Sequence, residues 1–319
     1  MLELNKIYQG DSLEVIKTFP SESINCCVTS PPYWALRDYG CEGQLGLEPT
    51  FNEYINKLCD IFDEVKRVLK KDGTCWVNIG DSYGQNYRGS GLDNCSIKQS
   101  KNKGTIDFMN KTKHNKDLIE KNLCNIPARF SIEMQNRGWI LRNVIIWYKP
   151  NCMPCSVKDR FTVDFEYVFF FVKNKSYWFE QQYEMLDKQT LERSKYNWTA
   201  DNQKSSAYKN LNGLNRNESY AEYIDFENGR NKRTVWKVTT KPYKEAHFAT
   251  YPKDLIEPMI KAGCPINGIV LDPFIGSGTT ALVSLEQNKQ YIGIELNPKY
   301  ITLCNKRLER WKGQKRLIL

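Results

Sequence analysis

Hydrophobic residues recur along this chain in two alternating patterns. Short apolar runs predict buried strands, and stretches with an apolar residue every three or four positions predict amphipathic helices. The alternation of the two is typical of an α/β fold built around a parallel sheet. The predicted strands are Lys6–Asp11, Ile24–Thr29, Thr74–Ile79, Trp139–Trp147, Val163–Val172, Gly268–Leu271 and Tyr291–Glu295. The predicted helices are Ser12–Lys17 with Ser12 as its cap, Phe51–Leu69 followed by an Asp72-Gly73 stop, Ile126–Arg137, Lys253–Ala262, 279–287 and Pro298–Trp311.

Two polar segments interrupt this pattern. Residues 84–120 and 184–240 are rich in Asn, Lys, Ser and Gly and follow neither the strand period nor the helix period. We interpret them as loops or as a small appended domain inserted into the sheet.

The length of the chain limits the number of domains, and its net charge indicates a class of binding partner. The chain has 319 residues, enough for one large domain with insertions or for two ordinary domains. Its 46 Lys and Arg residues outnumber 37 Asp and Glu residues, and the net charge of +9 favours a polyanionic partner.

Residue counts and apolar run lengths exclude other classes. Only two histidines are present, His114 and His247, which argues against a metal centre. The eleven cysteines include a single CxxC, at Cys152 and Cys155, and are interpreted as free thiols of a reducing cytoplasm. No apolar run reaches the length of a membrane span, and the first residues lack the features of a signal peptide. We therefore expect a cytoplasmic protein that uses neither a metal nor a membrane.

A glycine-rich turn near the end of the chain predicts a nucleoside pocket. The strand Ile269–Leu271 is followed by Asp272 and then by Gly276 and Gly278, where positive φ lets backbone amides approach a ligand. Glu295 ends the next strand, where a carboxylate can accept hydrogen bonds from both hydroxyls of a ribose. Asp272 would repel a pyrophosphate but suits a cationic group, which favours S-adenosylmethionine over NAD.

The first half of the chain carries a second unusual strand end. Ser30, Pro31, Pro32 and Tyr33 follow the apolar strand directly. Two prolines remove two backbone donors and leave carbonyl groups that can only accept. If the Ser30 hydroxyl and the Pro31 carbonyl both accept from the exocyclic amine of a nucleobase, the nitrogen lone pair turns towards an electrophile. Tyr33 would offer a face on which the base stacks.

Together the two strand ends resemble the DNA amino-methyltransferases of bacteria, of their restriction-modification systems and of phages. The order resembles the permuted β group, in which Ser-Pro-Pro-Tyr precedes the recognition region and the Asp272–Thr279 cofactor turn comes near the C-terminus. The resemblance extends from Tyr8 to about Arg310. Other matching pieces are Gly10-Asp11-Ser12, the strand ending in Asn78–Tyr83, Ile146–Pro150 and His247–Pro252.

The resemblance implies a circularly permuted, seven-stranded, Rossmann-like class I methyltransferase sheet that binds S-adenosylmethionine. Its catalytic residues would be Ser30, Pro31, Pro32 and Tyr33. Its cofactor-binding residues would be Asp272, Phe274, Gly276, Ser277, Gly278 and Thr279 around the methionine, Glu295 at the ribose, Asp11 at the adenine amine, Phe248 and Thr250 in the pocket wall, and also Asn297.

The same resemblance divides the chain into five parts. Residues 1–83 would be the catalytic half, 84–120 a DNA-contacting insertion, 121–183 the continuation of the core, 184–240 a variable target recognition region, and 241–319 the cofactor-binding half. The partner is expected to be double-stranded DNA, and a homodimer and a cognate restriction endonuclease both stay open. We hypothesise that the insertions grip DNA through their basic residues, which are Lys98, Lys101, Lys103, Lys111, Lys113, Lys116, Arg230, Lys232 and Arg233.

The target base and the rival classes stay open at this point. In the family, serine at the position of Ser30 usually accompanies cytosine N4 and aspartate accompanies adenine N6. A cytosine C5 enzyme would need a Pro-Cys-Gln turn, and Pro154-Cys155-Ser156 lacks the glutamine. The chain could also be an NAD-dependent enzyme or a non-catalytic nucleic-acid-binding protein, and its substrate could be RNA instead of DNA.

Overall fold

The computed structural model describes residues 2–36, 38–84, 119, 121–186, 229–240 and 251–316. It divides into two compact units, a larger one of Met1–Glu180 and Thr234–Leu319 and a smaller one of Gln181–Arg233. In the smaller unit the described strands β6 (Tyr183–Glu184) and β7 (Arg230–Asn231) pair antiparallel. Most of the predicted insertions, with Lys98 to Lys116 and with His114 and His247, lie outside the described residues.

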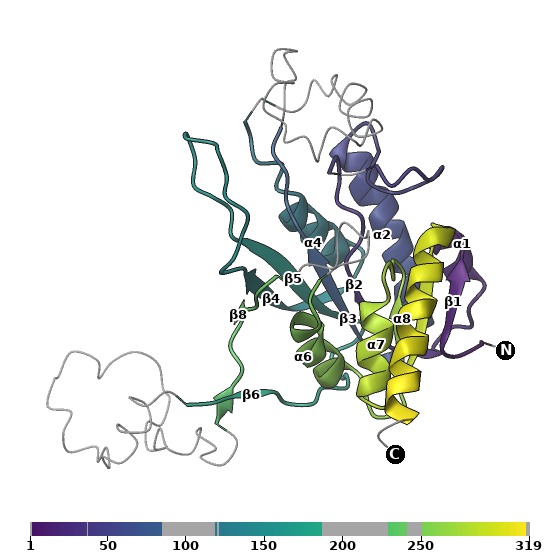
Figure 1. The fold of residues 1–319 in the computed structure, drawn as a ribbon. Coiled ribbons are helices and arrows are strands. Elements are labelled where there is room, and N and C mark those ends of the chain that lie inside the picture. Colours follow the sequence, from purple (N-terminus) through teal and green to yellow (C-terminus); the bar gives the residue numbers. More distant parts are fainter. Residues whose placement is uncertain are drawn as a thin grey trace, which may run out of the picture. The chain divides into compact units, whose positions relative to one another are not determined.

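The larger unit is built on a sheet whose described strands run in the order β1-β10-β9-β2-β3-β5-β4-β8. All neighbouring strands pair parallel except β5, which is antiparallel to both β3 and β4 (Figure 1). The strands are β1 (Lys6–Gln9), β2 (Ile24–Thr29), β3 (Leu69–Ile79), β4 (Ile140–Tyr148), β5 (Phe165–Val172), β8 (Val235–Lys237), β9 (Ile269–Asp272) and β10 (Gln290–Glu295).

Helices cover both faces of this sheet. Helices α1, α2 and α4 lie on one face and α6 and α7 on the other (Figure 1), and the buried side chains of the two groups belong to separate clusters. Successive residues of the central strands point to opposite faces, so Cys75 and Val77 join the first cluster and Trp76 joins the second. The helices are α1 (Ser12–Lys17), α2 (Phe51–Val68), α4 (Ile126–Asn136), α6 (Lys253–Gly263), α7 (Thr279–Glu286) and α8 (Pro298–Arg316).

The α/β class predicted from the sequence is confirmed, with three differences in detail. The described part of the sheet has one strand more than the expected seven, because Val235–Lys237 adds β8 beside β4. Strand β3 starts directly after α2, and Asp72-Gly73 lies inside it at an irregularity where Ile24 pairs with Leu69 and Cys26 with Thr74. The cap of α1 is Asp11 rather than Ser12, since the Asp11 side chain accepts from the Glu14 amide.

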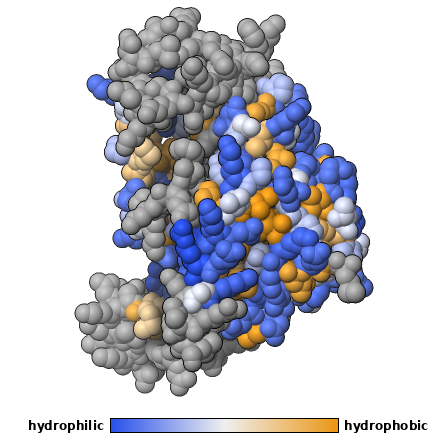
Figure 2. Space-filling view, turned by 45° about the vertical axis from the view of Figure 1, so that its right-hand side comes forward, coloured by the Kyte–Doolittle hydropathy of each residue, from blue (hydrophilic) through white to orange (hydrophobic). Residues whose placement is uncertain are grey.

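No described helix is long and apolar enough to cross a membrane. On the side that carries α1 and α8, hydrophilic side chains predominate and hydrophobic ones are scattered between them (Figure 2).

Candidate functional site

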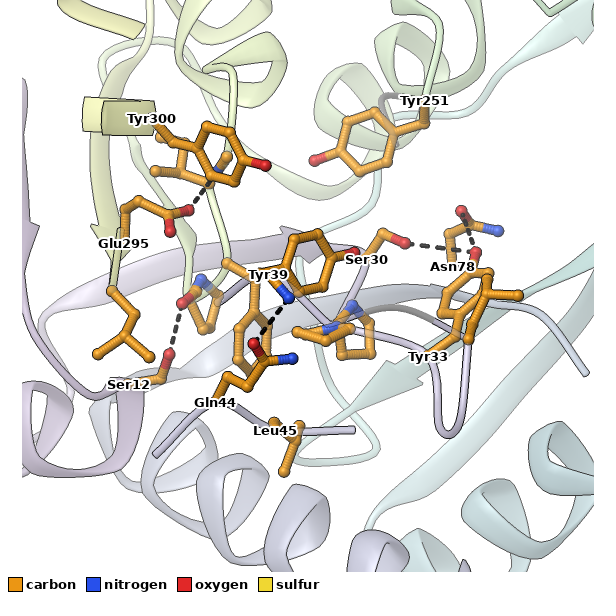
Figure 3. A pocket seen from close by; sticks show the side chains of 18 of the residues that line it. Ser12, Ser30, Tyr33, Tyr39, Gln44, Leu45, Asn78, Tyr251, Glu295 and Tyr300 are labelled. Atoms are coloured by element: carbon orange, nitrogen blue, oxygen red, sulfur yellow. Dashed lines mark hydrogen bonds between the residues drawn. The ribbon is translucent and has the colours of Figure 1, made fainter. Parts of the chain in front are cut away.

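A cavity of about 980 Å³ lies at the carboxyl ends of β1, β2, β9 and β10 (Figure 3). These strands are parallel, so their carboxyl ends meet at one edge of the sheet, where open α/β folds bind ligands. The structure therefore brings together the two strand ends that the sequence singled out. The predicted residues that line the cavity are Asp11, Ser30, Pro31, Pro32, Tyr33, Phe274, Gly276, Ser277, Thr279, Glu295 and Asn297.

Two of the predicted residues do not line the cavity, and two others cannot be compared with it. Asp272 and Gly278 are neighbours in sequence of residues that line the cavity, but they do not line it themselves. Phe248 and Thr250 lie outside the described residues.

The two glycines of the turn have different surroundings. Both adopt positive φ, 50° at Gly276 and 80° at Gly278. A Cβ at Gly278 would lie 2.1 Å from the Cys304 Sγ, so this glycine lets α8 pack against the turn. The Gly276 amide instead faces the carboxylate of Glu295.

Glu295 holds the turn with one oxygen and the start of α8 with the other. Its Oε2 accepts from the Gly276 amide at 3.0 Å, and its Oε1 accepts from the Asn297 amide at 2.8 Å. Burial raises the pKa of this carboxyl group, while the backbone amides act in the opposite direction. Each oxygen retains a lone pair, so the carboxylate can still accept from hydroxyl groups of a ligand in the cavity.

Asp272 is buried and serves as an acceptor for four donors. Its Oδ1 accepts from the Thr29 hydroxyl at 2.6 Å and from the Phe274 amide at 3.0 Å. Its Oδ2 accepts from the hydroxyls of Thr280 and Tyr251. Burial raises its pKa, against these hydrogen bonds. The carboxylate thus ties β2, β9, α7 and Tyr251 together behind the cavity wall.

The Ser-Pro-Pro-Tyr segment presents one carbonyl group rather than two. The Tyr54 hydroxyl donates to the Pro32 carbonyl at 2.8 Å, contrary to the sequence-based expectation that both proline carbonyls are unbonded. Within the described part of the chain, no hydrogen bond reaches the Pro31 carbonyl, and Pro31 lines the cavity together with Ser30.

A chain of hydroxyl and carboxylate groups leads away from Ser30. The Ser30 hydroxyl donates to the Tyr33 hydroxyl at 3.4 Å, and the Tyr33 hydroxyl donates to Glu166 Oε2 at 2.7 Å (Figure 3 shows Ser30, Tyr33 and Asn78 side by side). Asn78 Nδ2 donates to the same Glu166 oxygen at 3.1 Å, and Lys149 forms an ion pair with the other one. Burial, followed by the charge of Glu166, raises the pKa of Tyr33 well above its usual range, so its phenol keeps its proton.

Sequence reasoning missed several residues of this site. Glu166 begins an apolar strand and reaches Tyr33 only because β5 pairs antiparallel between β3 and β4. Tyr39 and Tyr300 face each other edge to face across the cavity, with ring centroids 6.4 Å apart. Motif fragments containing Asn78, Lys149 and Tyr251 matched the family pattern, but they gave no indication of what these side chains touch.

Metal ligands are not gathered at this site. Among the residues that the structure describes, no three His, Cys, Asp or Glu side chains are grouped so as to hold a metal ion.

Comparison with solved structures places the fold among Rossmann-like methyltransferases. The PvuII DNA methyltransferase, described as cytosine-N4-specific, aligns with a TM-score of 0.60 at 20% identity, covering 96% of this chain and 86% of that one. A protein of Thermus thermophilus described as a DNA modification methylase, solved with S-adenosyl-L-methionine, aligns with a TM-score of 0.58 at 20% identity, covering 96% and 93%.

The chain belongs to the DNA methylase family, whose model matches residues 24–306. It is similar to the type II methyltransferase M.Cfr9I of Citrobacter freundii, with 40% identity over 97% of this chain and 89% of that protein. It is equally similar to M.SmaI of Serratia marcescens, with 40% identity over 96% and 91%. The family suggested by the two sequence motifs is therefore confirmed.

Proposed function

We propose that this protein is a site-specific DNA methyltransferase that transfers a methyl group from S-adenosylmethionine to the exocyclic amine of a flipped base, cytosine N4. One observation carries the proposal: the acceptors Ser30 and Pro31 line the same cavity as the glycine turn at Gly276 and the carboxylate of Glu295 that binds it. The similarity to type II methyltransferases supports the DNA substrate, and Ser30 favours cytosine N4 over adenine N6.

The cavity has the chemistry that S-adenosylmethionine requires. Glu295 offers acceptors for the ribose hydroxyls, and Asn297, Tyr300 and Tyr39 surround the adjoining space. The turn Phe274–Thr279 offers the wall for the methionine part, and Asp11 for the adenine amine. When bound there, the cofactor supplies a methyl group on a positively charged sulfur.

Asp272 has a positioning role in this proposal. Because its carboxylate is buried and already accepts from four donors, it fixes the turn rather than binding the ammonium group of the cofactor directly. Its negative charge still favours a cation in the adjoining cavity.

The hydroxyl chain fixes Ser30 as an acceptor. A serine hydroxyl accepts freely only if its own hydrogen points elsewhere, and Tyr33 takes that hydrogen. Tyr33 can do so because its own hydrogen goes to an acceptor, Glu166 Oε2 at 2.7 Å with Asn78 Oδ1 at 3.2 Å beside it, and carboxylate oxygens only accept. The lone pairs of Ser30 and the Pro31 carbonyl are therefore available to the amine. As the amine nitrogen gains the methyl group, its proton passes to Ser30, the Ser30 proton to Tyr33 and the Tyr33 proton to Glu166.

The test is expression in a host that lacks DNA methylation, followed by mass spectrometry of the nucleosides and single-molecule sequencing of the context. N4-methylcytosine at one sequence is the expected result. If the product is N6-methyladenine, the target base is adenine and not cytosine. If the DNA is unmodified, the proposed function is wrong. Ser30→Ala is expected to lose most DNA methylation in this assay. Calorimetry on the purified variant is expected to show unchanged binding of S-adenosylmethionine.

A further inference from the structure

The connection between β4 and β5 exposes apolar side chains to an unusual degree. Phe161 is 95% exposed and Met153 84% exposed, and Val157 and Val163 are also exposed. Globular proteins rarely leave so many large apolar side chains together in water, and such groups mark binding surfaces. Figure 1 shows this loop, in teal, extending beyond the ends of the two strands.

The loop is held in place at its base, so the exposure does not come from an unattached segment. The Asn151 side chain exchanges two hydrogen bonds with the backbone of Thr240, both at 2.9 Å. The Arg160 guanidinium lies 3.8 Å from the centre of the Tyr83 ring, directly before Phe161.

The exposed side chains stand at the mouth of the cavity. Met153 and Val163 line the cavity together with Asn151, so Met153 belongs both to the cavity wall and to the outer surface. Phe161 lies two residues before Val163. A base that enters the cavity from a duplex must therefore bring the neighbouring bases close to this loop.

The charges of the loop fit a polyanion. Asp159 is paired with Lys121 at 2.6 Å, which compensates its negative charge. Lys158 and Arg160 add positive charge beside the exposed side chains, while Lys149 at the start of the loop pairs with Glu166 and Asp164 at its end is the other acidic residue. This combination of apolar tips and cations is what the unstacked bases and phosphates of an opened duplex can bind.

We infer that the β4–β5 loop, residues 149–164, is an apolar wedge that packs against the bases left unstacked when the target nucleotide leaves the helix. The inference rests on the proposed function, since it assumes a DNA substrate with a flipped base. Met153 and Phe161 would supply the contact area, and the cavity behind Met153 would receive the base.

The first test measures DNA affinity without any reaction. The duplexes are an intact one and the same one with a single abasic site, and the proteins are the wild type, the double variant Met153→Ala/Phe161→Ala and the control Ile266→Ala. Ile266 is 73% exposed but precedes β9, away from the carboxyl ends of the strands. We expect the wild type and the control to bind the abasic duplex about fivefold more tightly than the intact one, and the double variant to lose this preference. Equal preference in all three proteins would overturn the inference.

The second test measures methyl transfer at the sequence that the wild type modifies. On a fully paired site the double variant is expected to lose about tenfold in kcat/KM, and on a site whose target base is mispaired the loss should shrink, because less unstacking is required. An equal loss on both sites, or a wild-type dimer that the double variant dissociates in sedimentation, would overturn the inference. A wild type that transfers no methyl group to any DNA would overturn the proposed function, whereas the abasic-site comparison would still decide on the wedge.

Discussion

At the scale of single residues, the direction of a few hydrogens decides what the cavity can do. Ser30 and Tyr33 are both able to donate or accept, and the acceptors at the far end, Glu166 Oε2 at 2.7 Å and Asn78 Oδ1 at 3.2 Å from the Tyr33 hydroxyl, give their chain a direction. Glu166 lines the cavity, but in the proposed mechanism it is separated from the amine by Ser30 and Tyr33. It acts through Tyr33 and is a positioning residue.

Replacing Glu166 by glutamine should weaken this order, because the new amide can donate to Tyr33 and the carboxylate acceptor is lost, while Asn78 Oδ1 at 3.2 Å is the acceptor that stays. We expect kcat to fall about tenfold to a hundredfold with the cofactor KM unchanged. Tyr33→Phe should give a similar loss, and the double variant should lose no more than either single one, as measured in steady-state assays. Losses that add fully would contradict a shared chain, and an unchanged melting temperature would separate the effect from misfolding.

The raised pKa of Glu295 predicts a pH dependence of cofactor binding. The proposed contact with the ribose needs the ionised carboxylate, so on that proposal the affinity is full where Glu295 is ionised and falls as the pH drops through its pKa. Because burial raises that pKa above 4.5, the loss should begin at a higher pH than for an exposed glutamate. Calorimetry across this range should show the fall in the wild type and a weaker, flat profile in Glu295→Gln. If the fall persists in that variant, Asp272, whose pKa is also raised, becomes its source.

Sequence reasoning reached those residues of the site that stand in a local pattern. The glycines and the two prolines follow predicted strands and Glu295 ends one, and strand ends of a parallel sheet meet at one edge. Glu166 and Tyr251 could not be found in this way, because their partners come from distant segments. Only the register of β5 and the four donors around Asp272 reveal them.

At the scale of elements, the glycine turn is shaped by the helix packed behind it. Helix α8 places Cys304 where a side chain at position 278 would stand. The turn therefore owes its form to helix packing as much as to a ligand, which the sequence alone could not distinguish.

Gly278→Ala should be costly for this reason. The variant meets both an unfavourable φ of 80° and the Cys304 Sγ at 2.1 Å. Gly40→Ala is the matched control, since Gly40 has a φ of 70° and nothing within 4 Å of an added Cβ. We expect the free energy of unfolding to fall by about 1 kcal/mol at Gly40 and by roughly 3 kcal/mol at Gly278. Equal losses in denaturant titrations would show that strain, rather than the packing of α8, determines the cost.

Element positions were predicted well because most strands and helices carry a clear period. The exceptions are instructive. Strand β8 has three residues, of which Trp236 is the buried one, and this is too short a run for an alternating pattern to mark it in a polar segment. The early start of β3 follows from pairing with Ile24, a contact that no local pattern encodes.

At the scale of the whole molecule, the order of the strands in the sheet is the feature that the sequence predicted least. The α/β class follows from alternation along the chain, and the permuted motif order suggested that both ends of the chain build one site. That β2 lies between β3 and β9 could be stated only once the pairings were known.

The position of β2 has a consequence for how the protein is made. Cys26 and Cys27 pair with Val270 and Leu271, which the ribosome produces only after the long intervening stretch. At about 5–20 residues per second, one edge of this fully buried strand waits on the order of ten to fifty seconds for its neighbour. The nascent chain must therefore keep an apolar strand edge from pairing wrongly, and the cavity beside β2 can form only after β9 and β10 have been made.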